Sequence, residues 1–205
     1  MESKSRTGAR EAVAGSSRNP ALLPERSSGR TEPPLDEIAL ADAEQELGVD
    51  FPPEYRAFLR EVSAGGVGLY PLVRDDQGWH WRDSFDRRVR PARLGQPFQD
   101  AAERERLEAE YEALQPLHES FPDEESFTAA WRRWNQGWDE LSERLESGTV
   151  QISDQGCGNY IYLVVTGPER GTVWWGSGPY LDPVKPSPQS SPADRVTFRQ
   201  WYPFR

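Results

Sequence analysis

Three short strands are predicted in GTVQISDQGCGNYIYLVVTGPERGTVWWG, the segment from Gly148 to Gly176. Residues 149–153 are rich in β-branched side chains and alternate in polarity, residues 160–166 are apolar on both faces, and residues 172–175 form the third strand. A strand that is apolar on both faces must be covered on both faces, so helices from elsewhere in the chain have to pack against it. The segment therefore predicts a buried antiparallel meander.

The connection between the first two strands contains Gly156, Cys157 and Gly158. Glycine accepts positive φ, so this motif predicts a tight structural turn that sets the register of the meander. A catalytic Cys157 would need a general base, and the two histidines, His80 and His118, lie far from it in sequence. The flanking glycines favour the structural interpretation, which leaves a hydrolase using Cys157 as a third hypothesis. No catalytic residue and no enzyme is predicted.

Metal and cofactor sites are not predicted either. One cysteine and two histidines cannot supply the closely spaced ligands of a zinc site, and no glycine-rich phosphate-binding fingerprint occurs. The single cysteine excludes a disulfide within the chain, which is typical of a reducing compartment. The sequence shows no signal peptide and no apolar run of membrane-spanning length, so we expect a cytoplasmic protein without a membrane role.

The length of 205 residues suits one domain with a tail. Residues 1–34 consist largely of Ser, Gly, Arg and Pro, which predicts a disordered tail, and residues 35–205 form the predicted domain. The net charge is −10, and segment 99–147 holds 14 acidic and 5 basic residues, a net charge of −9. An acidic surface disfavours direct nucleic-acid binding and favours a basic protein partner. The alternative is a solvated helix face that aids solubility.

Segment 99–147 carries two helical patterns. In the first, Leu107, Tyr111 and Leu114 recur at helical spacing. The second is a long stripe, mostly aromatic, and we expect it to cover the open face of the sheet, since a helix of this amphipathicity normally lies on a core. The alternative is that some of its tryptophans reach the surface as binding anchors. The stripe consists of Phe127, Trp131, Trp134, Trp138, Leu141 and Leu145.

Two further helices are predicted near the start of the domain. The first begins near Leu35, ends at Gly48 as a left-handed C-terminal cap, and is expected to bury Ile38 and Ala41, with Leu40 and Leu47 as further candidates. The second begins at Pro53, because proline is favoured in the first helical turn. Its predicted apolar face consists of Tyr55, Phe58, Leu59 and Val62.

Strands are predicted at residues 69–73 and 79–81, joined by a turn. His80 is expected to be an edge or partly exposed strand residue, because no cysteine or second histidine is near it in sequence. The basic run 87–93 is interpreted as a solvated loop, with contact to an acidic partner as the alternative. The proline-rich segment 182–192 predicts an extended surface loop.

Two separated motifs resemble one known family. The first is a helix ending in Leu-Gly, followed by FPPEYRAFL at residues 51–59 and SAGG at 63–66; the second is the Gly-Cys-Gly meander with its following LVVTGP and Trp-containing strand. Together they cover roughly 36–73 and 148–202 and resemble the SUKH superfamily, the Smi/Knr-like domain. Ala64 stands where the family often has Asn, and the match to the family's last helix covers only its start.

The resemblance implies an α+β domain, with a mostly antiparallel sheet and helices packed on it. It also implies protein binding: bacterial members are typically immunity proteins that neutralise a toxin, often a nuclease, and fungal relatives are regulatory interaction proteins. Our first hypothesis is therefore an immunity protein that occludes a basic toxin, and the alternative is a regulatory scaffold without a toxin. The candidate partner-binding surface is Asp100, Glu103, Glu105, Glu108, Glu110 and Glu112 with Trp131 and Trp138.

Overall fold

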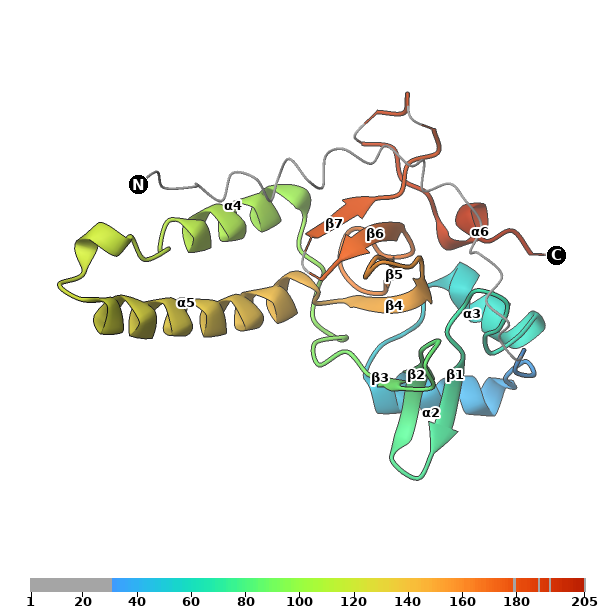
Figure 1. Cartoon of the computed structure of the whole chain (residues 1–205). Helices are drawn as coiled ribbons and strands as arrows, with labels where there is room; N and C mark the ends of the chain where they lie inside the picture. The colour runs from blue at the N-terminus through green and yellow to red at the C-terminus, as the bar shows by residue number, and fades with distance from the viewer. Residues whose placement is uncertain (1–30, 179, 188, 192, 205) are drawn as a thin grey trace.

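The computed structural model describes residues 31–178, 180–187, 189–191 and 193–204. Residues 1–30 of the predicted tail lie outside this range, so the disordered tail stays a prediction. Within the described residues, five α-helices and two antiparallel sheets form an α+β fold, as expected (Figure 1).

The predicted meander is present. β4 (Thr149–Asp154), β5 (Tyr160–Val164) and β6 (Val173–Ser177) pair antiparallel in chain order. β5 is buried over nearly its whole length, as its apolar composition predicts. A fourth strand, β7 (Tyr180–Pro183), pairs with β6 and was not predicted. Its signal is weak because it has only four residues and ends in a proline, which an edge strand tolerates.

A second, smaller sheet contains β1 (Leu72–Asp75), β2 (Gly78–Arg82) and β3 (Arg88–Val89) in that order. The expectation for His80 is wrong, since its side chain lies in β2 and the residue is only 5% exposed. β2 is the central strand: His80 pairs with Val73 of β1, and the next residue, Trp81, pairs with Val89 of β3.

α2 (Glu37–Leu47) ends at Gly48, whose φ of 69° is left-handed as predicted. Its predicted buried face is wrong for Ile38, which is 81% exposed, and for Ala41, which also faces solvent, whereas the further candidates Leu40 and Leu47 are buried. The observed orientation buries three apolar side chains in the main core, and it also lets Asp42 accept a 2.8 Å hydrogen bond from the indole nitrogen of Trp79. Apolar spacing alone could not reveal this contact with another element. The buried face consists of Leu40, Ala43 and Leu47.

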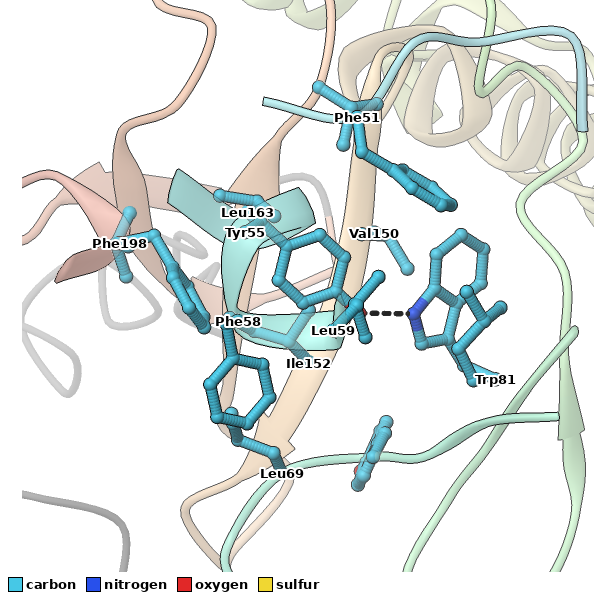
Figure 2. Packing of buried hydrophobic residues seen from close by; sticks show 14 of the residues in the cluster. Phe51, Tyr55, Phe58, Leu59, Leu69, Trp81, Val150, Ile152, Leu163 and Phe198 are labelled. Carbon is cyan, nitrogen blue, oxygen red and sulfur yellow. Dashed lines mark hydrogen bonds between the residues drawn. The ribbon is translucent and has the colours of Figure 1, made fainter. Parts of the chain in front are cut away.

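The main core lies between α3 (Pro53–Glu61) and the β4–β5 part of the sheet (Figure 2). Tyr55 is fully buried there, and its hydroxyl accepts a 2.8 Å hydrogen bond from the indole nitrogen of Trp81. Burial raises the pKa of Tyr55 well above its ordinary value. α6 (Phe198–Trp201) closes this core, with the Phe198 ring 5.1 Å from that of Tyr55 in a T-shaped contact.

α4 (Ala101–Glu112), the short 3-10 helix η1 (His118–Ser120) and α5 (Glu124–Leu145) form a helical hairpin that projects away from the sheets (Figure 1). We call residues 99–147 the arm. The aromatic stripe of α5 therefore does not cover the sheet, contrary to expectation. One face of the sheet contributes to the main core, and the other is filled by its own large side chains Tyr162 and Trp174 together with Phe98.

Candidate protein-interaction surface

The base of the arm is held by a buried arginine. Arg104 of α4 is 4% exposed, and its guanidinium donates a hydrogen bond to the carbonyl of Leu145 at the end of α5. A cation is favoured at this position because the carbonyl end of a helix is partially negative. The guanidinium also lies 5.0 Å from the centre of the Phe98 ring. Burial lowers the pKa of Arg104 from its ordinary value. Arg104 thus joins both helices to the residues that cover the sheet.

Aromatic rings fill the seam between the two helices. The Tyr111 ring of α4 stacks on Trp134 at 5.2 Å and contacts Trp138 at 5.5 Å, while Trp131 lies 5.1 Å from Trp134. Gly137 allows this approach, since a Cβ there would be 3.1 Å from the Tyr111 hydroxyl. All four rings are only partly buried. The seam therefore holds the two helices together although its rings remain partly exposed to solvent.

Both helices of the arm begin at an aspartate cap. Asp100 accepts a 2.9 Å hydrogen bond from the backbone nitrogen of Glu103, and Asp123 accepts one of 2.8 Å from that of Ser126. Such caps satisfy backbone donors at the start of a helix, which have no partner within the helix. Asp100, predicted as a partner contact, thus has a structural contact of its own.

The predicted carboxylates of α4 fall on two faces. Glu103 and Glu110 each lie 2.6 Å from Arg106, which partly neutralises both. The hydrogen bonds from Arg106 hold the pKa of Glu103 below its ordinary value. Glu105, Glu108 and Glu112, at i, i+3 and i+7, share a second face of the helix. Glu105 and Glu112 are exposed, and Glu108 is partly buried.

The two predicted tryptophans lie in the seam instead of beside these carboxylates. Trp131 is between Trp134 and Phe127, and Trp138 contacts Tyr180 of β7 at 5.7 Å. Both indoles are partly exposed, so each has an edge that a partner can reach. The candidate surface therefore divides into a carboxylate face on α4 and an aromatic seam along α5.

Exposed apolar residues at the far end of the arm were not predicted as a site. Leu114 is 71% exposed and Leu117 is 57% exposed. The apolar spacing assigns Leu114 to the inner face of α4, but that helix ends at Glu112 and Leu114 lies beyond its last residue. Pro116, directly before Leu117, is the sequence signal for this early end.

The family comparison matches most of the chain. The model of the SMI1 / KNR4 family (SUKH-1) matches residues 34–189, which is more than half of the 205 residues. The chain belongs to this family. A search of curated proteins and a search of solved structures gave no match. Membership confirms the resemblance seen in the two sequence motifs, and it is consistent with a protein of the toxin-immunity type that acts through protein–protein contact.

In this SUKH-1 chain, the Gly-Cys-Gly segment connects β4 and β5 with left-handed backbone, which glycine accepts and which is unfavourable for Cys157. Gly156, Cys157 and Gly158 have φ values of 79°, 53° and 77°. The hydrogen bonds of both histidines go elsewhere: the Nδ1 atom of His80 is 3.1 Å from the carbonyl of Gly78, and the Nε2 atom of His118 is 2.9 Å from Glu124. Neither contact supports a nucleophilic role for the exposed Cys157.

Other candidate sites on the SUKH-1 domain are similarly accounted for. The arginines of the run 87–93 pair with carboxylates of the same chain, as the 2.7 Å contacts of Arg87 with Asp83 and of Arg88 with Asp75 show. Across the described residues, His, Cys, Asp and Glu form no group of three or more that could hold a metal. No described helix has both the length and the apolar character needed to span a membrane.

Proposed function

We propose that this SUKH-1 protein is an immunity protein. It binds a cognate toxin with a basic surface, such as a nuclease, and neutralises it by stoichiometric occlusion. Family membership supports a protein-binding role. The observation that carries the proposal is the arm, which projects from the sheets and holds −9 of the chain's net charge of −10 (Figure 1).

The charge of the arm suits a nuclease because such an enzyme has to bind phosphate backbones and therefore carries lysine and arginine at its substrate site. An acidic rod is attracted to the same surface and blocks access of the nucleic acid. Complementary charges chiefly raise the association rate, whereas apolar contacts slow dissociation. The exposed carboxylates Glu105 and Glu112 are placed to act in the first way, and the partly exposed Trp131 and Trp138 in the second.

The test is co-expression with the protein encoded by the adjacent gene. We expect that protein to kill the host cell when it is expressed alone, and this chain to restore growth. Equal killing with and without this chain contradicts the proposal. If the neighbouring protein is harmless and the chain instead binds signalling or cell-wall proteins, the regulatory scaffold replaces it.

A matched pair of variants tests the role of the arm. E105Q/E112Q removes two exposed charges from α4, and D50N/D76N removes two exposed charges outside the arm. We expect the first pair to lower the association rate constant with the purified toxin about threefold to tenfold at low salt, and the second pair to change it less. Stopped-flow or biolayer interferometry at two salt concentrations measures both. An equal effect of the two pairs contradicts a role specific to the arm.

A further inference from the structure

The far end of the arm differs from the rest of its length. α5 has 22 residues and α4 has 12, so α5 extends beyond α4 by ten residues, or about 15 Å of helix. Residues 113–123, which include η1, close this overhang. We call residues 112–127 the tip. It is the part of the described chain that lies farthest from the sheets along the arm (Figure 1).

The tip presents its two exposed leucines on an ordered backbone. The backbone nitrogen of Leu114 donates to the carbonyl of Tyr111 at 3.0 Å, and the carbonyl of Leu117 accepts from Ser120 at 3.0 Å. The His118 ring lies 4.8 Å from that of Phe127, which anchors the connection to α5. Side chains held in this way lose less conformational freedom on binding than those of a loose loop. The leucines are therefore preorganised for contact with a partner.

The charged groups near the leucines in sequence are mostly carboxylates, and one of these, Glu124, contacts His118. Between positions 112 and 125 the chain has five acidic residues and no lysine or arginine. All five are exposed. By contrast, Arg106 partly neutralises the carboxylates in the middle of α4. The acidic residues of the tip are Glu112, Glu119, Asp123, Glu124 and Glu125.

We propose that the tip anchors the protein partner, with Leu114 and Leu117 entering an apolar pocket whose rim carries lysine and arginine. This inference rests on the proposed immunity function and narrows its surface from the whole arm to one end. A second copy of this chain does not fit, because two tips would bring five like charges against five. A basic rim neutralises the carboxylates, while the central pocket removes the leucines from water, which is the usual division of an interface into rim and core.

The test compares two double variants of the full chain, in each of which two large exposed apolar side chains are replaced by serine. L114S/L117S removes the tip's apolar side chains, and the control I38S/F85S removes two apolar side chains elsewhere that are 81% and 71% exposed. The probe is the purified product of the adjacent gene, and the readouts are Kd and the dissociation rate. We expect the tip pair to weaken binding about 10- to 100-fold, mainly through faster dissociation, and the control pair to change it less than about threefold. Circular dichroism establishes that both variants keep their helix content.

Three results overturn the proposal, and they have different meanings. If the tip pair binds as tightly as the unaltered chain, the anchor lies elsewhere on the arm and the immunity function stands. If both pairs weaken binding equally, the effect is not specific to the tip. If the unaltered chain neither binds nor neutralises the neighbouring protein, the proposed function fails and the tip inference fails with it.

Discussion

Gly65 gives a physical reason for one of the motifs on which the family resemblance rests. Its φ is 150°, and a Cβ on it would lie 2.2 Å from the Cα atom of Pro71. We expect G65A to lower the free energy of unfolding by about 3 kcal/mol or more, because strained backbone and a clash with another backbone segment combine. Urea denaturation followed by tryptophan fluorescence measures the change.

Gly156 is the matched control for this prediction. Its φ of 79° is also unfavourable for alanine, but a Cβ there has nothing within 4 Å. G156A should therefore cost only about 1–2 kcal/mol, the penalty of a left-handed residue. Equal losses in the two variants would show that the close approach to Pro71 is unimportant.

We expect the folding stability to depend on pH through Glu146, at the end of α5. Burial raises the pKa of its carboxyl above the ordinary 4.5, and Glu143 adds to this, while the nearby Arg104 opposes it. A folded-state pKa above the unfolded value gives stability that is present at low pH and is lost as pH rises through the folded pKa. E146Q should therefore raise the melting temperature at pH 7 and leave it nearly unchanged at pH 4. Thermal melts at both pH values test this, and a larger gain at pH 4 contradicts it.

At the scale of whole elements, the sequence predicted where several helices and strands lie, but it did not predict which surfaces the helices pack against. The start of α3 at Pro53 and the three strands of the meander follow from residue type and alternation, which act within a few residues. The face that a helix buries depends on its partner. α2 buries Leu40 and not Ile38, and α5 packs on Tyr111 instead of on the sheet. Periodicity shows that a face is apolar but does not show what covers it.

Replacing Arg104 should destabilise the arm, since this residue joins α4 to the end of α5. We expect R104A to cost about 2–3 kcal/mol, because a charged hydrogen bond inside the protein is lost. The effect should be local: amide hydrogens of α4 and α5 exchange faster, while those of β5 keep their protection. Hydrogen exchange with mass spectrometry measures both. R106A is the control, because its ion pairs lie on the surface and contribute about 0–1 kcal/mol.

For the whole molecule, the candidate surface was chosen from the charge distribution, and its role in binding stays a prediction. The excess of acid in segment 99–147 predicted an interaction segment, and the structure shows this segment as a projecting arm. It could not predict which carboxylates are already paired or which apolar residues the arm exposes. Both depend on where α4 ends, and Leu114 is exposed because it lies two residues beyond Glu112, the last residue of that helix.

The two ends of the arm lie close together. A Cβ on Gly148 would lie 2.6 Å from the backbone nitrogen of Phe98, and the nitrogen of Gly148 donates to the carbonyl of Arg93 at 3.0 Å. A short Gly-Ser link can therefore replace residues 99–147 without moving the strands. The buried leucines of the arm form a cluster separate from the main core, so their loss leaves that core intact.

We expect this shortened chain to fold cooperatively, with a net charge near −1 because −9 of the original −10 is removed. Its melting temperature should fall, since Phe98 loses the cover of Arg104. It should also fail to neutralise the toxin, because the acidic surface is absent. The two sequence motifs of the family are still present in the shortened chain. Circular dichroism melts and the co-expression assay measure the two properties separately. A folded, shortened chain that still protects the cell would place the interaction on the sheets or on α2 and α3, and an unfolded one would show that the arm is part of the folding unit.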